Sequence, residues 1–176
     1  RTSKENIKND MVYRKIKIAI IGSRGIPGNY GGFETFADHL SVGLAERGHR
    51  VSVYCSATYS NSEDREYKGV KRDLIPTVPS KSLEKLSNSL LSCLHAAISS
   101  YDIVLLLGVS PILFAWLLRL FGKQLIINPD GLEWKRQKWS WFGSKFLETC
   151  EMFSGYFCQH IVTDSKVLQK YFLNRY

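Results

Sequence analysis

The sequence predicts an α/β domain built on a Rossmann-like, doubly wound parallel sheet of about six strands. Three observations lead to this prediction. Short apolar runs alternate with segments whose apolar residues recur at helical spacing, which is the pattern of βαβ units. The run 102–107, DIVLLL, is apolar after its first residue, as in a parallel strand that is covered on both faces. The first apolar run ends in a cluster of glycines and turns at once into a helical pattern.

In the first half of the chain, residues 15–21 are expected to form a strand and residues 33–47 a helix that Gly48 stops. Further strands are expected at 50–55 and 69–75, on either side of a loop at 57–68. The segment 82–100 carries the clearest helical stripe, formed by Leu83, Leu86, Leu90, Leu94, Ala97 and Ile98.

In the second half, Ser110 is expected to cap a helix that has Pro111 at its first position and runs to Phe121. The predicted order along the whole chain is β-α-β-β-α-β-α-β-α-β-α. Ligands of such sheets bind at the carboxyl ends of the strands. The remaining expected elements are strands at 102–107, 123–128 and 160–163 and helices at 142–157 and 165–176.

Composition indicates a single globular domain. The 176 residues are enough for one full core, and 44% of them are hydrophobic. The net charge of +8 favours an anionic partner, such as a nucleotide phosphate, a membrane surface or a nucleic acid. No apolar run reaches the roughly 18 residues of a membrane span, and no signal peptide opens the sequence. Residues 1–14 are expected to be a leader or foreign to the native protein, and 15–176 to be the domain.

The four cysteines are Cys55, Cys93, Cys150 and Cys158, and no two of them form a CxxC pair. Because they fall in expected strands or helices, we expect reduced thiols packed in the core of a cytoplasmic protein. The sequence shows no cluster of metal ligands, so we expect no metal and no cofactor.

The segment from Ile20 to His39 is the most informative part of the chain. Five glycines, namely Gly22, Gly25, Gly28, Gly31 and Gly32, fall within eleven residues directly before a helix. Such a loop folds tightly and leaves its N–H groups uncovered, while the first turn of the helix adds further N–H donors and partial positive charge. The pattern predicts a phosphate or diphosphate site, although an irregular turn without a ligand would use the same glycines.

Spacing excludes two common nucleotide loops. A dinucleotide fingerprint needs GxGxxG and an acidic residue at the end of the second strand, whereas here the glycines recur by threes and the strand leads into Ser56 and Ala57. A Walker loop needs a Gly-Lys-Ser/Thr triplet, which does not follow.

A second cluster, NPDGLEWKRQKWSW, follows the strand that ends at Asn128 and contains three of the four tryptophans. Aromatic rings beside cations are suited to sugars and phosphorylated acceptors. Two simpler interpretations stay open. The tryptophans could anchor a basic loop to the core, and Asp130 could be a turn residue, because Asp-Gly is a common turn pair.

Four segments together resemble the N-terminal domain of bacterial rhamnosyltransferase-like enzymes, which are retaining nucleotide-sugar glycosyltransferases of GT-B fold. The segments are GSRGIPGNYGGFETF, ERGHRVSVYC, NPDGLEWKRQKW and VTDSKVLQKYF, and the likeness covers nearly the whole chain after Lys15. The first and third are fairly specific, whereas the second is common to many GT-B enzymes.

The resemblance implies roles for matching positions. The glycine pair at the head of the first helix would lie against the donor diphosphate, and the loop after the fifth strand would face the reacting centre, although it lacks the histidine that many relatives carry there. The implied diphosphate-binding residues are Gly31, Gly32, Phe33, Glu34 and Arg24. The implied catalytic residues are Asp130 and Glu133, and the implied acceptor-binding residues are Gly131, Trp134, Arg136 and Lys138.

A GT-B enzyme has two Rossmann-like domains, so the resemblance implies an acceptor-side half whose donor domain is absent and which alone should not turn over. The complete enzyme would transfer a sugar, L-rhamnose from a dTDP donor, to a saccharide or lipid-linked acceptor in surface polysaccharide assembly. A basic surface with tryptophans could also rest on the inner face of the plasma membrane.

Two other functions compete with this prediction. An NAD-dependent oxidoreductase or epimerase would fit the fold, but this sequence lacks the acidic residue that binds the ribose in such enzymes. A nucleic-acid-binding module would fit the sequence pI of about 9.4, but its basic residues are mostly dispersed and the glycine loop would have no role. We therefore expect a nucleotide sugar as the partner and no nucleic acid.

Overall fold

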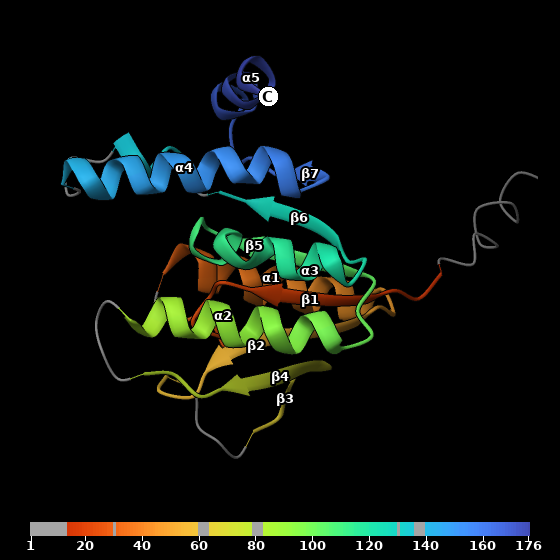
Figure 1. The fold of residues 1–176 in the computed structure, drawn as a ribbon. Coiled ribbons are helices and arrows are strands. Elements are labelled where there is room, and N and C mark those ends of the chain that lie inside the picture. Colours follow the sequence, from red (N-terminus) through yellow and green to blue (C-terminus); the bar gives the residue numbers. More distant parts are fainter. Residues whose placement is uncertain (1–13, 30, 60–63, 79–82, 130, 136–139) are drawn as a thin grey trace, which may run out of the picture.

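The computed structural model describes residues 14–29, 31–59, 64–78, 83–129, 131–135 and 140–176. Seven strands form one sheet in the order β3-β4-β2-β1-β5-β6-β7 (Figure 1). All neighbouring strands are parallel except β3 and β4. The strands are β1 (Lys17–Ile21), β2 (Arg50–Ser56), β3 (Glu66–Tyr67), β4 (Val70–Ile75), β5 (Ile103–Leu107), β6 (Gln124–Asn128) and β7 (His160–Ile161).

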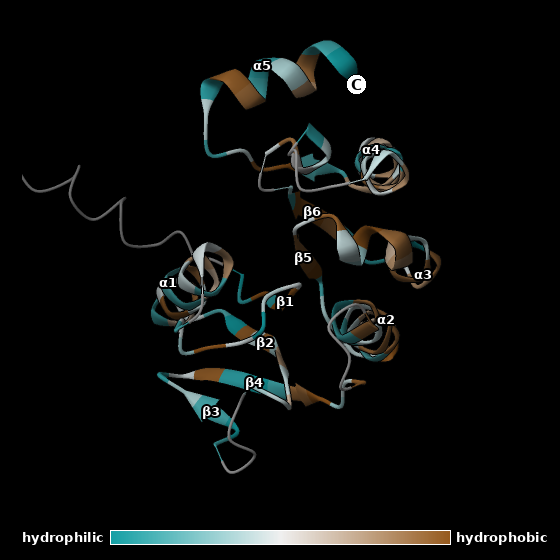
Figure 2. Ribbon diagram, turned by 90° about the vertical axis from the view of Figure 1, so that its left-hand side faces the viewer, coloured by the Kyte–Doolittle hydropathy of each residue, from teal (hydrophilic) through white to brown (hydrophobic). Residues whose placement is uncertain are grey.

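Helices cover both faces of the sheet, as the predicted doubly wound fold requires. In Figure 2, α1 lies on one side of the strands and α2, α3 and α4 lie on the other. The helical elements are α1 (Gly32–Glu46), α2 (Leu83–Ile98), η2 (Ser110–Phe114), α3 (Ala115–Leu120), η3 (Glu133–Lys135), α4 (Trp141–Phe157) and α5 (Lys166–Arg175), of which η2 and η3 are 3₁₀ turns.

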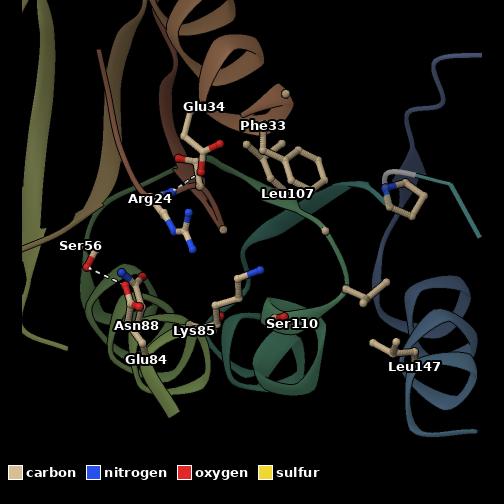
Figure 3. Close-up of a pocket in the computed structure, with 17 residues that line it drawn as sticks. Arg24, Phe33, Glu34, Ser56, Glu84, Lys85, Asn88, Leu107, Ser110 and Leu147 are labelled. Carbon is tan, nitrogen blue, oxygen red and sulfur yellow. Dashed lines mark hydrogen bonds between the residues drawn. The ribbon is translucent and has the colours of Figure 1, made fainter. Parts of the chain in front are cut away.

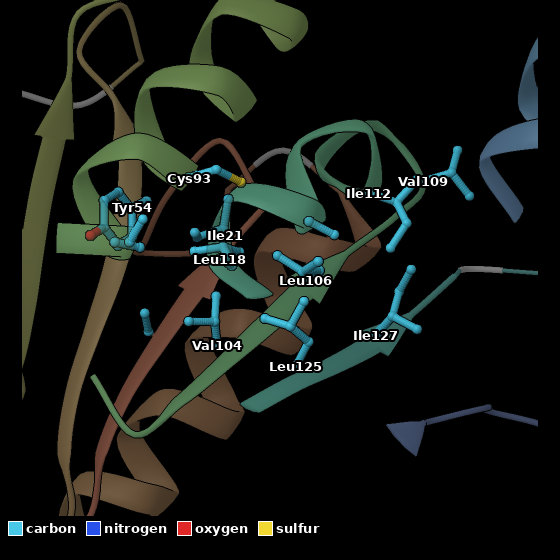
Figure 4. Packing of buried hydrophobic residues seen from close by; sticks show 14 of the residues in the cluster. Ile21, Tyr54, Cys93, Val104, Leu106, Val109, Ile112, Leu118, Leu125 and Ile127 are labelled. Atoms are coloured by element: carbon cyan, nitrogen blue, oxygen red, sulfur yellow. The ribbon is translucent and has the colours of Figure 1, made fainter. Parts of the chain in front are cut away.

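Two apolar cores lie between the sheet and these helices, because successive side chains of a strand point to opposite faces. Ile20 and Val53 pack towards α1, whereas Ile21, Leu106 and Ile127 pack towards α2, η2 and α3 (Figure 4). All five of these side chains are fully buried, as expected for parallel strands covered on both faces.

Two details of the predicted elements were wrong. The loop expected at 57–68 contains β3, which forms a hairpin with β4 across Lys68 and Gly69, both at positive φ. A two-residue strand is too short to show periodicity, and this turn chemistry carries its only signal. Ser110 does not cap a helix, because the chain tightens into η2 at Ser110 itself and the cap position falls on Val109 without a side-chain bond.

The helix predicted at 82–100 is confirmed as α2, but its leucine stripe does not face the sheet. Leu83, Leu94 and Ile98 are 52%, 43% and 75% exposed. The buried face consists of small and polar residues, namely Asn88, Ser89, Ser92, Cys93, Ala96 and Ala97. Ser92 Oγ donates to Asn88 Oδ1 at 3.0 Å, which satisfies both buried groups. Small side chains let α2 lie close to the sheet, where leucines would not fit.

The cysteines lie where the sequence places them. Cys55, Cys93 and Cys150 are buried, and Cys158 is partly buried. Burial raises the pKa of the Cys93 thiol to about 12 and that of Cys150 to about 11. These thiols are therefore protonated near neutral pH and act as packing groups.

Candidate functional site

The sheet has its switch point between β1 and β5. The chain leaves β1 for α1 on one face and leaves β5 for η2 on the other, so the two loops separate at the carboxyl edge. A cavity of about 360 Å³ opens there. Its lining comes from the loops after β1 and β5, the first turns of α1 and α2, the ends of β2 and β5, Pro129 after β6 and Leu147 of α4. The fold thus brings the carboxyl ends of the neighbouring strands β2, β1, β5 and β6 together around one cavity.

The glycine loop, residues 22–31, is held by carboxylates of the helix that follows it. Glu34 Oε1 accepts a hydrogen bond from the Arg24 amide at 3.0 Å, and Asp38 Oδ2 accepts one from the Gly28 amide at 2.9 Å. The Arg24 carbonyl accepts a hydrogen bond from the Ser56 amide of β2 at 2.9 Å. The loop is therefore fixed to both α1 and the sheet before any ligand arrives.

Glycines in this loop are required for different reasons. At Gly22, φ is +111° and an added Cβ would lie 2.1 Å from the Leu107 carbonyl oxygen. At Gly28, an added Cβ would lie 2.8 Å from the Glu34 carbonyl oxygen. These two glycines are needed for the fold itself, because backbone atoms occupy the place of a side chain.

Gly32, the first residue of α1, is different because an added Cβ would meet no atom within 4 Å. It lines the cavity at the positive end of the helix dipole. No packing contact within the described part of the protein therefore demands a glycine here, and the missing side chain leaves room for a ligand to approach the N-terminus of α1.

Charged groups line the cavity on both sides. Arg24 and Lys85 extend into it from the glycine loop and from α2 (Figure 3). The Arg24 guanidinium lies over the Tyr59 ring, 4.7 Å from its centroid, and the Tyr59 hydroxyl donates to Glu84 Oε2 at 3.4 Å. Two cations and the amides near Gly32 suit an anion, while the carboxylates of Glu34 and Glu84 suit sugar hydroxyls.

Ser23 adds one polar group without a partner. Its side chain is only 4% exposed, and its hydroxyl finds no hydrogen-bond partner among the described residues. The residue precedes Arg24 in the sequence, and both line the cavity. A buried hydroxyl without a partner is costly, so a ligand oxygen within reach would be favoured.

Four of the predicted diphosphate-binding residues line the cavity, namely Arg24, Gly32, Phe33 and Glu34. Gly31, the cap residue of α1, directly precedes Gly32. The sequence reasoning missed the opposite wall, which consists of Glu84, Lys85, Asn88, Ser89, Gly108 and Ser110. Only the topology could have predicted these residues. Right-handed crossover connections make each helix of a parallel sheet begin at the carboxyl edge, and this places the first turns of α2 beside the cavity.

The tryptophan segment, residues 129–141, is placed only in part. The predicted residues Asp130, Arg136 and Lys138 lie outside the described residues. Glu133 lies in η3, and Gly131 has φ of +83°. Of the described residues in this segment, Pro129 is the one that lines the cavity. The proposed catalytic and acceptor roles in this segment remain predictions.

Trp134 points into the protein. Its indole N–H donates to Glu151 Oε2 at 2.8 Å, and Ser144 Oγ donates to its backbone carbonyl. Glu151 is 1% exposed and also accepts a hydrogen bond from the Tyr171 hydroxyl at 2.8 Å. Burial, together with the bond to Glu151, raises the pKa of Tyr171. The indole therefore joins η3 to α4 and α5.

The described residues carry neither a cluster of metal ligands nor a helix suited to span a membrane. They contain no group of three or more His, Cys, Asp or Glu side chains arranged to hold a metal ion. Among the helices that the structure describes, none has the length and apolar character needed to cross a membrane.

A family model described as a domain of unknown function, DUF1972, matches residues 15–176. The chain belongs to the DUF1972 family. No curated protein sequence gives a significant match. Among solved structures, sucrose-phosphate synthase from Thermosynechococcus elongatus superposes with a TM-score of 0.68 at 18% identity.

The superposition covers 92% of the DUF1972 chain but 45% of the synthase chain. At this identity the match concerns the fold. The domain has the Rossmann-like α/β fold of one half of a GT-B enzyme, as the sequence predicts.

Proposed function

We propose that this chain is the acceptor-side domain of a retaining nucleotide-sugar glycosyltransferase. The observation that carries the proposal is the cavity at the β1/β5 switch point, where Gly32 leaves the N-terminus of α1 uncovered and Arg24 and Lys85 face the same space. The GT-B half-fold supports it, since the solved synthase that shares the fold is by its title a sucrose-phosphate synthase.

The donor in this proposal is a nucleotide diphosphate sugar, dTDP-L-rhamnose, and the acceptor is a saccharide or a lipid-linked saccharide of a surface polysaccharide. The acceptor hydroxyl attacks the anomeric carbon as the bond to the diphosphate breaks, and the leaving phosphate takes the hydroxyl proton. No metal takes part. The amides at Gly31 and Gly32, the α1 dipole and Arg24 stabilise the charge that develops on the diphosphate.

Phe33 and Glu34 complete the diphosphate wall in this proposal. Asp130 and Glu133 are the proposed catalytic residues, and Gly131, Trp134, Arg136 and Lys138 the proposed acceptor contacts. For Trp134, the bond to Glu151 leaves the ring faces and not the indole N–H for such a contact.

The test is a transfer assay of the full-length protein with a panel of nucleotide sugars that includes dTDP-L-rhamnose. Gly32→Val should lower kcat/KM about 100-fold, because two methyl groups would stand between the helix N-terminus and the diphosphate. Its stability should change by less than about 1 kcal/mol, because an added Cβ meets no atom within 4 Å and valine is tolerated in a helix about as well as glycine.

Gly43→Val is the matched control. It places the same side chain in the same helix, where the nearest atom to the new Cβ is the Arg47 guanidinium at 3.8 Å. The control should retain wild-type transfer. Equal turnover of the two variants would contradict the diphosphate assignment, and quenching of tryptophan fluorescence by NAD but not by dTDP would favour an oxidoreductase.

A further inference from the structure

A second cavity lies at the amino edge of the sheet, at the opposite end of the strands from the cavity at the β1/β5 switch point, the switch-point cavity. It measures about 660 Å³, a size typical of small-molecule pockets. The starts of β1 and β2, the β3–β4 hairpin and the last turn of α2 with the residues after it line this amino-edge cavity. Helix α2 runs from one edge of the sheet to the other, so its two ends border the two cavities (Figure 1). The two cavities share no lining residue.

Cations reach the amino-edge cavity from three neighbouring strands. In the register of the sheet, Lys17 at the start of β1 is the partner of Arg50 at the start of β2. Ser52, two residues after Arg50, is the partner of Lys71 in β4. Because side chains alternate between the faces of a strand and partners share a face, these residues project from the same face of the sheet. Arg65, just before β3, completes a group of four cations that line one cavity.

One of the four cations is paired within the protein. Lys71 Nζ lies 2.5 Å from Asp73 Oδ1, and the other oxygen of that carboxylate accepts a hydrogen bond from the Tyr101 hydroxyl at 3.0 Å. The hydrogen bond to Asp73 raises the pKa of Lys71, whereas the positive charge of Arg65 acts to lower it. The two cations are therefore close enough to repel each other.

The other three cations, Lys17, Arg50 and Arg65, form no ion pair with any residue that the structure describes. Among the described lining residues, Glu66 is the one carboxylate. Asp102 accepts a hydrogen bond from the Lys17 backbone amide at 2.7 Å but lies outside the lining. Like charges at partnered positions of neighbouring strands are unfavourable, so an anion in the cavity would relieve the repulsion.

We propose that the amino-edge cavity binds the phosphate or diphosphate group of a small molecule. The four lining cations exceed two carboxylates, Glu66 in the lining and Asp73 in the ion pair, by two. This surplus matches the charge of a phosphate ester near neutral pH. The guanidinium groups of Arg50 and Arg65 would bind pairs of phosphate oxygens, and Lys17 would add a point charge.

Neutral groups beside the cations would complete the site. The Ser100 hydroxyl accepts a hydrogen bond from Lys17 Nζ at 2.9 Å, which leaves its own proton for a ligand oxygen. His95 Nδ1 lies 2.7 Å from the Tyr54 hydroxyl, which leaves Nε2 for a ligand. Ser100 and His95 both line the cavity, and the partly exposed Tyr101 ring offers an apolar surface for the rest of the molecule.

The experiment is isothermal titration calorimetry of the full-length protein with inorganic pyrophosphate. Arg24→Gln/Lys85→Gln serves as the parent, because it removes both cations of the switch-point cavity and leaves the amino-edge cavity intact. The parent should bind pyrophosphate, and should bind it less tightly at high salt. Adding Arg50→Gln/Arg65→Gln should weaken binding at least about tenfold. Both side chains are exposed, so the protein should still fold.

Lys166→Gln/Lys170→Gln in the same parent is the matched control, because it removes two exposed cations of α5 that do not line the cavity. It should leave pyrophosphate binding unchanged. Equal weakening by both pairs, unchanged binding without Arg50 and Arg65, or no binding by the parent would overturn the proposal. A single-stranded oligonucleotide that binds the parent more tightly than pyrophosphate does, and only while Arg50 and Arg65 are present, would assign the cavity to a nucleic acid instead.

The amino-edge cavity is independent of the proposed function. In otherwise wild-type protein, Arg50→Gln/Arg65→Gln should retain transfer, since neither residue lines the switch-point cavity. Pyrophosphate binding by the parent without any transfer by wild type would contradict the proposed function alone. Transfer by wild type without pyrophosphate binding by the parent would contradict the amino-edge site alone.

Discussion

The glycine loop after β1 and the tryptophan segment after β6 leave the same edge of the sheet, but they are attached to the molecule in opposite ways. Carboxylates of α1 hold the backbone of the glycine loop, through the amides of Arg24 and Gly28, and its remaining surface lines the cavity. The tryptophan segment instead sends a side chain inward, where Trp134 reaches the buried Glu151. The first region therefore presents a fixed backbone to the cavity, whereas Trp134 of the second region packs against the core.

Among substitutions in the two regions, Gly22→Ala in the glycine loop is expected to have the largest effect on stability. A Cβ would lie 2.1 Å from the Leu107 carbonyl oxygen in a left-handed backbone conformation, so the free energy of unfolding should fall by about 3 to 5 kcal/mol. Urea denaturation measures it. Gly122→Ala is the control, because φ is +72° but no atom lies within 4 Å of the new Cβ. A similar loss in both variants would mean that backbone conformation, not the contact with β5, makes Gly22 necessary.

A smaller effect is expected from Trp134→Phe in the other region. Phenylalanine keeps an aromatic ring but removes the donor to Glu151, so unfolding should become about 1 to 3 kcal/mol easier. Trp141→Phe is the matched control, since that side chain is 67% exposed and should change stability by less than about 0.5 kcal/mol. Unchanged stability of the Trp134 variant would show that its indole is not an anchor and would return it to the acceptor-binding candidates.

The smallest effect is expected from Asp38→Ala, which removes the acceptor of the Gly28 amide. Stability should fall by about 1 kcal/mol, and hydrogen exchange at the Gly28 amide should speed up. Asp38→Asn should restore slow exchange, because an amide oxygen accepts the same bond. Fast exchange in the asparagine variant as well would mean that charge, rather than the hydrogen bond, orders the glycine loop.

Local patterns in the sequence were sufficient for the order of the longer elements and for the position of the glycine loop. Strand and helix periods are local properties, and the glycine cluster before α1 marks a close approach of backbone to ligand wherever the strand lies. Arg24, Gly32, Phe33 and Glu34 line one cavity, and the diphosphate-binding role that the resemblance implies for them stays a prediction. The hairpin at Lys68 and Gly69 was missed because its strand spans only two residues.

The sequence did not predict which way the helices and side chains are oriented relative to the sheet. The leucine stripe of α2 identified a helix, but periodicity does not say which side of a helix meets the sheet, and here the small residues do. For the same reason Lys85 and Glu84 could not be assigned to the cavity before the strands were ordered. The sequence of the tryptophan segment likewise shows which residue types are present but not where their side chains point. Only the structure shows that Trp134 points inward, because its indole N–H donates to Glu151.

The sequence by itself determined the doubly wound α/β class, the phosphate-suited glycine loop and the absence of a dinucleotide fingerprint, because each depends on residues close together in the chain. Only the tertiary structure decided which glycines the fold requires, which helix closes the cavity and which apolar side chains remain exposed. These depend on contacts between distant segments, such as Gly22 with Leu107 and α2 with η2, whose packing sets the space that the cavity leaves open.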